Sequence, residues 1–186
     1  MTNAFTIFEE EIAETEQKVP ALNLIVTTMY TLTCFGQENF DTLVSNAISF
    51  SSKLLKKNMQ CEATTLASHL FYCNFQKHGN KVMELLRKAL KTSEICMTKP
   101  ENLYLLVNIL NTYLYYFAAE SEFMKAEDII TLCSFIKETI DEMEDLNDPA
   151  RAALKALQNV RASITIKAGK DTRFGQILSQ MPEFSK

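Results

Sequence analysis

Apolar residues recur every three or four positions along almost the whole chain, and this spacing is typical of amphipathic α-helices. Because the pattern is interrupted only by the few turn-forming residues, it predicts about eight helices. Their expected ranges are 3–17, 20–36, 38–57, 62–77, 81–97, one opening at Pro100, one ending near residue 143 and one opening at residues 148–149. Short connections make neighbouring helices antiparallel, so the sequence predicts an all-α fold built from helix hairpins.

The predicted helices differ in charge. The even-numbered ones are uncharged over residues 22–35, 63–76 and 102–119, whereas the odd-numbered ones carry many charges, as residues 81–91 do. Hairpins of about 40 residues form either a closed bundle or an α-solenoid of HEAT type. In a two-layer solenoid one row of helices faces solvent. A second row that lacks charge but keeps Asn, Thr and Tyr is typical of a surface covered by a partner.

Polar and aromatic residues follow helical spacing on each of the three uncharged helices. They are Asn23, Thr27 and Tyr30, then Thr65, His69 and Tyr72, and finally Tyr104, Asn108, Asn111 and Tyr115. One interpretation is that the three stripes form a docking surface for a partner. The alternative is that they lie inside a bundle and satisfy one another by hydrogen bonds. The spacing alone does not decide between the two.

Composition excludes several classes of protein. With four glycines and four prolines, the chain has too few turn residues for a sheet protein with many hairpins. The glycines are too widely spaced for a G-x-G-x-x-G or G-x-x-x-x-G-K-[ST] loop, so no glycine-rich nucleotide loop is expected. A net charge of −4 without a basic stripe argues against a general nucleic-acid-binding role.

The sequence contains no convincing catalytic or metal site. His69 and Cys73 are one helical turn apart, but two side chains do not make a zinc site and no third ligand is indicated. We therefore expect no enzyme, no metal and no cofactor. The competing class is a small metal-dependent hydrolase that uses these two residues with nearby carboxylates.

The cysteines and the chain start favour a cytoplasmic protein. There is no C-x-x-C pair, and the cysteines lie within helical pattern, so we expect reduced thiols that act as small core residues. They are Cys34, Cys61, Cys73, Cys96 and Cys133. The N-terminus has no basic segment typical of a secretory signal, and the uncharged stretches 19–37 and 102–119 are too polar for membrane spans.

The first third of the chain contains one acidic and one basic group of side chains. The acidic group is Glu9, Glu10, Glu11 and Glu14, and the basic group is Lys53, Lys56 and Lys57. A solvated helix face explains the first, and a favourable position at the end of the third predicted helix explains the second. The alternative is that the two groups meet across a two-fold axis and form a homodimer.

Five segments resemble the vacuolar protein sorting-associated protein 35 family in order and spacing. They are residues 8–12, 52–57, 69–71, 82–91 and 109–115. The resemblance implies a HEAT-like α-solenoid, with residues 1–168 as a carboxy-terminal solenoid segment and residues 169–186 as an irregular tail. It also implies a non-enzymatic scaffold of the retromer coat, cytoplasmic and peripheral on endosomal membranes, that takes part in retrieval of cargo.

The resemblance further implies partners for the two surfaces. The uncharged stripes would bind the metallophosphoesterase-fold subunit, vacuolar protein sorting-associated protein 29. The acidic and basic groups would join two copies of the chain. An arrestin-like subunit would be bound only by an amino-terminal part that this sequence lacks. The alternative is an unrelated all-helical homodimeric adaptor module.

Overall fold

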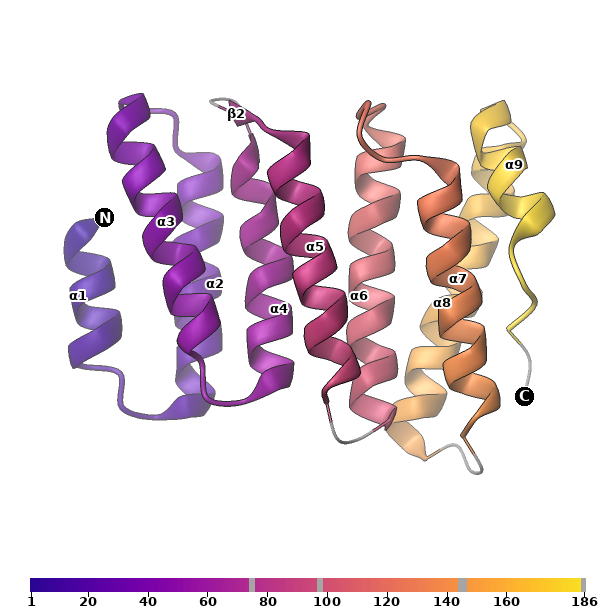
Figure 1. Ribbon diagram of the computed structural model, residues 1–186, viewed down its shortest axis with the longest axis horizontal. Coiled ribbons are helices and arrows are strands. Elements are labelled where there is room, and N and C mark those ends of the chain that lie inside the picture. Colours follow the sequence, from indigo (N-terminus) through magenta and orange to yellow (C-terminus); the bar gives the residue numbers. More distant parts are fainter. Residues whose placement is uncertain (74–75, 97–98, 144–146, 185–186) are drawn as a thin grey trace. The chain divides into compact units, whose positions relative to one another are not determined.

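The computed structural model describes residues 1–73, 76–96, 99–143 and 147–184 of the 186-residue chain (Figure 1). Within these ranges the regular structure is helical apart from one pair of two-residue strands, which confirms the all-α prediction. None of the helices in the described ranges combines the length and apolarity needed to cross a bilayer. The chain divides into two compact units, Met1–Ile95 (unit 1) and Cys96–Lys186 (unit 2).

Unit 1 is a series of helices, each packed against the next. Its elements are α1 (Thr2–Glu10), α2 (Thr15–Thr31), α3 (Gln37–Lys53), α4 (Lys57–Ala67), the 3₁₀-helix η1 (Ser68–Phe71), β1 (Tyr72–Cys73), β2 (Gln76–Lys77) and α5 (Gly79–Glu94). Besides these sequential contacts, α2 packs against α4. The core includes Leu22, Met29, Phe40, Leu70 and Leu86, which have no exposed surface. Burial of such large apolar side chains is the main force holding the helices together.

Unit 2 is formed by α6 (Lys99–Ala118), α7 (Ala126–Asp141), α8 (Asp148–Ala168) and α9 (Thr172–Gln180). α6 packs against both α7 and α8, and α9 packs against the same two helices (Figure 1). Leu103, Leu106, Ile109, Tyr116 and Ile136 are fully buried between them. Most apolar side chains of α6 are thus covered within the chain, whereas Tyr104 and Tyr115 remain about half exposed.

The predicted boundary between the first two helices is wrong. α1 is shorter than expected and α2 begins at Thr15, so Pro20 lies inside α2 rather than in its first turn. The chain reverses at residues 11–14, and α1 packs the aromatic ring of Phe5 against Phe50 of α3, with ring centroids 5.4 Å apart. This contact between distant parts of the chain outweighs the local preference of proline for a helix start.

The predicted helix over residues 62–77 is also wrong at both ends, because α4 starts and stops earlier. The Ser68 hydroxyl donates a hydrogen bond to the Thr65 carbonyl at 2.7 Å, which competes with the backbone bonds of a continuing helix. The chain then forms the strand pair β1–β2. Residues 74–75 of the predicted helix lie outside the described residues. Gly79 opens α5 and does not cap the helix before it.

The prediction of an irregular tail over residues 169–186 is wrong, because α9 lies within it. The Asp171 carboxylate caps α9 by accepting a hydrogen bond from the Arg173 amide at 3.0 Å. Phe174 and Ile177 follow at helical spacing and are buried. A capping residue followed by an apolar i, i+3 pair was the signal that the sequence contained for this helix.

Two other predicted helix starts are confirmed. α8 opens at Asp148, where the Asn147 side chain accepts a hydrogen bond from the Ala150 amide at 3.0 Å and a proline occupies the first turn. α6 begins one residue before Pro100. The expected end of the helix over residues 81–97 lies outside the described residues.

Candidate partner-binding surfaces

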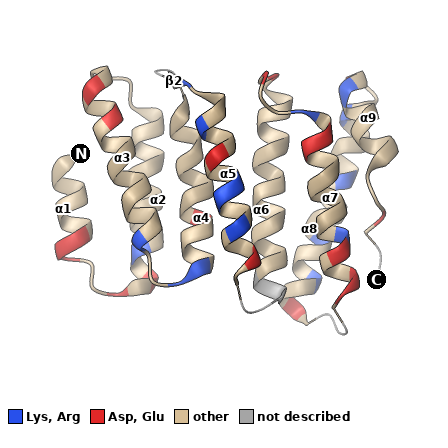
Figure 2. Cartoon of the chain, viewed as in Figure 1, with Lys and Arg blue, Asp and Glu red and all other residues tan. Residues whose placement is uncertain are grey.

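α6 carries a stripe of polar and aromatic side chains on its outer side. Tyr104 and Tyr115 keep 51% and 47% of their surface exposed, Asn111 is exposed and Asn108 is half-buried. From residue 102 to its end the helix has no charged side chain, in contrast to α5 and α7 (Figure 2). The alternative of burial inside a bundle is therefore wrong for most of this stripe, which forms an uncharged surface of unit 2.

In unit 1 the stripe on α2 lies beside residues of η1. Thr27 is exposed, and Asn23 and Tyr30 are half-buried. The ring centroids of Tyr30 and His69 are 6.2 Å apart with an interplanar angle of 78°, so these two residues from different elements form one edge-to-face contact. Burial lowers the pKa of His69, which keeps the imidazole uncharged at neutral pH. The surface here is again uncharged.

The remaining predicted residues of unit 1 are less accessible. Thr65 is buried, and its hydroxyl donates to the Cys61 carbonyl at 2.8 Å. The Thr65 side chain thus belongs to the protein interior, as the alternative interpretation expected. Tyr72 is half-buried and lies in β1 instead of a helix.

Two residues near these stripes were missed by the sequence analysis. Leu24 is 70% exposed on α2, three positions before Thr27 and therefore on the same side of the helix. Glu62 is half-buried on α4, and burial raises the pKa of its carboxyl group. The i, i+3 spacing to Thr27 was a signal for Leu24, whereas nothing in the sequence indicated the partial burial of Glu62.

The acidic and basic groups lie at the same end of unit 1 (Figure 2). All seven side chains are exposed: Glu9, Glu10, Glu11, Glu14, Lys53, Lys56 and Lys57. Glu9 and Lys53 line one shallow hollow together with Phe8 and Phe50. The Lys53 ammonium lies 5.4 Å from the centre of the Phe50 ring. Glu9 of α1 and Lys53 of α3 are thus neighbours beside two aromatic rings, whereas Lys56 and Lys57 lie at the start of α4.

The structure corrects the helix-dipole explanation for the basic group. Lys53 is in the last turn of α3, where a positive charge is favourable. Lys56 and Lys57, however, are the N-cap and first residue of α4, where a positive charge is unfavourable. The dipole therefore does not explain two of the three lysines.

The pair considered for metal binding is embedded in the protein. The Cys73 thiol is buried and donates to the Leu70 carbonyl at 3.4 Å, and His69 contacts Tyr30. Within the described residues, no three His, Cys, Asp or Glu side chains come together in a way that could hold a metal ion.

The cysteines are unbridged, and most of them fill the core as predicted. Cys61, Cys73 and Cys133 are buried and Cys96 is half-buried, whereas Cys34 is exposed, which corrects the expectation for that residue. Burial raises the pKa of the Cys133 thiol to about 12, so it stays protonated at neutral pH.

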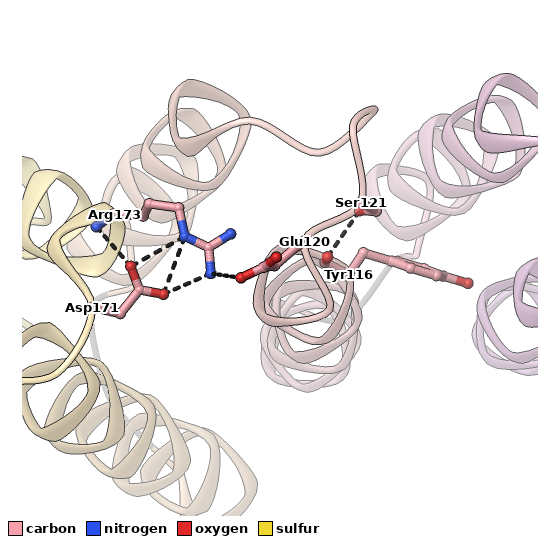
Figure 3. Close-up of polar contacts among 5 residues, drawn as sticks. All are labelled: Tyr116, Glu120, Ser121, Asp171 and Arg173. Carbon is pink, nitrogen blue, oxygen red and sulfur yellow. Dashed lines mark hydrogen bonds and ion pairs between the residues drawn. The ribbon is translucent and has the colours of Figure 1, made fainter.

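A polar cluster fixes α9 to the end of α6 (Figure 3). Glu120 has a φ of 57°, and the Ser121 amide donates to the Tyr116 carbonyl at 3.1 Å, which is the geometry of a Schellman cap without glycine. The Arg173 guanidinium donates to Glu120 at 3.2 Å and to Asp171 at 2.6 Å. The hydrogen bonds from Arg173 lower the pKa of Asp171. This cluster has a structural role in unit 2.

Comparison with known proteins gives a consistent result. The family model for vacuolar protein sorting-associated protein 35 matches residues 1–139. Vacuolar protein sorting-associated protein 35B of Arabidopsis thaliana is 36% identical over 158 residues, which cover 78% of this chain and 19% of that protein. Vacuolar protein sorting-associated protein 35 of Schizosaccharomyces pombe is 32% identical over 146 residues, covering 75% of this chain and 18% of that protein.

The match extends over most of the described helices. It includes α1 to α6 and most of α7, whereas α8 and α9 lie beyond the residues that the family model matches. The chain spans about a fifth of the length of these relatives. The resemblance predicted from the five short segments is confirmed, and the chain belongs to the vacuolar protein sorting-associated protein 35 family.

Proposed function

We propose that this chain serves as a scaffold segment of the retromer coat, peripheral on endosomal membranes, with a HEAT-like solenoid architecture. Family membership and the succession of packed helices in each unit support this role. No catalytic role is proposed, because the family is one of non-enzymatic scaffold proteins. Its contribution to protein sorting is then to hold other subunits in place.

The outer side of α6 is the proposed docking site for the metallophosphoesterase-fold subunit, vacuolar protein sorting-associated protein 29. The observation that carries this proposal is the pair Tyr104 and Tyr115, each about half exposed on an uncharged helix. Centres of protein interfaces are depleted of charge, and tyrosine is enriched among the residues that dominate binding energy. Asn108 and Asn111 supply hydrogen-bonding groups between the two rings.

The surface of α2 and η1 in unit 1 is proposed as a separate contact for the same subunit. Leu24 offers a large exposed apolar side chain, and Thr27 is exposed beside it. Asn23, Tyr30, His69 and Tyr72 border this area. The buried Asn23 Oδ1 has no hydrogen-bond partner among the described residues. We do not assign Thr65 to the contact, because its side chain is buried.

Titration calorimetry with the purified metallophosphoesterase-fold subunit tests the docking site on α6. Tyr115→Glu and Asn111→Asp should each weaken binding at least about tenfold, because each leaves a charge unpaired in the interface. Thr131→Glu, on the exposed side of α7, is the matched control and should bind like the unmodified chain. Full affinity in both α6 variants would place the interface elsewhere.

The second proposed function is homodimerisation through the acidic and basic groups. The observation that favours it is the placement of Lys56 and Lys57 at the start of α4, where the helix dipole disfavours positive charge. None of the four carboxylates forms an ion pair with another described residue. Exposed ion pairs contribute only about 0–1 kcal/mol each, so the dimer should be weak and sensitive to salt.

Charge reversal tests the dimer directly by sedimentation. Glu10→Lys with Glu14→Lys should give a monomer, and so should Lys53→Glu with Lys56→Glu. Across a two-fold axis each contact occurs twice, so an equimolar mixture of the two variants should form a heterodimer. An unmodified chain that stays monomeric at low salt and high concentration contradicts the proposal.

A further inference from the structure

The segment that follows α9 runs back along α8. We name residues Met181, Pro182, Glu183 and Phe184 the strap. Met181 and Phe184 are 5% exposed, so both apolar side chains of the strap are buried, while its Glu183 carboxylate points to solvent. The strap is thus anchored by its first and last side chains, and the Glu183 side chain between them is exposed.

Two side chains of α8 hold the strap by its main chain. The Gln158 amide donates to the Phe184 carbonyl at 3.4 Å, and the Arg161 guanidinium donates to the Pro182 carbonyl at 3.3 Å. Arg161 also pairs with the Glu183 carboxylate at 3.4 Å. These distances are at the long end for hydrogen bonds. Recognition therefore rests on two carbonyls, one acidic side chain and one buried aromatic ring.

The strap does not fill the groove in which it lies. A hollow of about 340 Å³ remains, lined on α8 by Gln158, Arg161, Ala162 and Thr165 and on the strap by Glu183 and Phe184. The hollow is open to solvent, so the strap covers only part of the α8 surface along which it lies. Long hydrogen bonds and an unfilled groove are typical of a ligand that can leave, and less so of a permanent part of the core.

We propose that this groove on α8 is a docking site for an extended peptide with a proline–acidic–aromatic sequence, and that the strap occupies it in cis. Proline limits the conformations of the free peptide and so reduces the entropy lost on binding. Arg161 recognises the acidic side chain and the carbonyl before it, and the aromatic ring is the buried anchor. The groove lies beyond the residues that the family model matches.

Because the strap occupies the groove in cis, it competes with any external peptide and so regulates access to the groove. A segment tethered next to its binding groove has an effective concentration on the order of millimolar. An external peptide of equal intrinsic affinity therefore binds the unmodified chain weakly. A partner gains access when the strap is released, and the chain then exchanges an internal contact for an external one.

Fluorescence anisotropy on the 186-residue chain tests the proposal, with a labelled peptide of the sequence of residues 178–186 as the probe. Phe184→Ser removes the anchor of the strap and should raise the affinity for the peptide at least about tenfold over the unmodified chain. Adding Arg161→Ala to this variant should abolish the gain. Arg151→Ala is the matched control on the same helix and should preserve it, because Arg151 pairs only with Asp148 among the contacts described.

A second variant separates release of the strap from unfolding of the protein. Glu183→Lys changes a side chain that is 82% exposed, so it weakens the strap without disturbing the core, and it should also raise peptide affinity. A peptide in which the phenylalanine is replaced by serine should not bind to either variant. If neither variant binds the probe better than the unmodified chain, the strap is a permanent part of unit 2 and the proposal is wrong.

Discussion

α4 of unit 1 and α6 of unit 2 both carry residues of the predicted polar stripes, yet they present them differently. α4 packs against α2, α3 and α5, and its Thr65 side chain is buried. α6 packs against α7 and α8, and Tyr104, Asn111 and Tyr115 remain on its outer side. A polar stripe at helical spacing is therefore not by itself a docking surface. The number of neighbours around it decides how much of the helix a partner can reach.

The largest expected change in the free energy of unfolding distinguishes the buried side of α6 from its exposed side. Tyr116 is fully buried, and its ring lies 5.1 Å from that of Phe123, whereas the adjacent Tyr115 is about half exposed. Tyr116→Ala should lower the free energy of unfolding by about 3–5 kcal/mol, because it leaves a cavity in the core. Tyr115→Ala should lower it by about 0.5 kcal/mol. Urea unfolding followed by circular dichroism measures both, and equal losses would mean that Tyr115 is part of the core.

A smaller effect should distinguish the stripe residues of α4 and α6. Thr65→Asp places a charge at a buried position of α4 and should lower the free energy of unfolding by about 2–3 kcal/mol. Asn111→Asp places the same charge on the outer side of α6 and should change it by less than about 0.5 kcal/mol. Thermal unfolding at neutral pH compares the two variants. A destabilised Asn111→Asp would show that this side of α6 is covered within the chain.

The smallest effect should come from Glu62, the half-buried carboxyl group of α4. Burial raises its pKa above the ordinary value of 4.5, so folding favours the protonated form. The stability that the proton provides is present below about pH 4.5 and is lost as the pH rises through the raised pKa. Glu62→Gln should therefore stabilise the chain at pH 7 by less than about 1 kcal/mol and have little effect at pH 4. Urea unfolding at both pH values measures this, and an equal effect at both would show that burial does not act on the carboxyl group.

Local patterns in the sequence were sufficient for the helices whose ends are marked by their own side chains. The Asn147 cap and the following proline placed the start of α8. The same reasoning overlooked α9, although Asp171 caps it in the same way. Pro20 was misleading, because packing of α1 onto Phe50 moved the start of α2 ahead of it. The end of α6 depends on Glu120 in a left-handed conformation, where no glycine indicated such a cap.

The surfaces were predicted in part. The spacing of Tyr104, Asn111 and Tyr115 placed them on one side of a helix, since 3.6 residues per turn follow from backbone geometry alone. Whether that side faces solvent depends on which helices pack around it, and those contacts join residues far apart in the chain. The strap on α8 is a further case, because it brings Phe184 to Gln158 and Arg161. Periodicity and charge thus establish the helices and the difference between charged and uncharged ones. The tertiary contacts decide which polar residues are buried and which remain accessible to a partner.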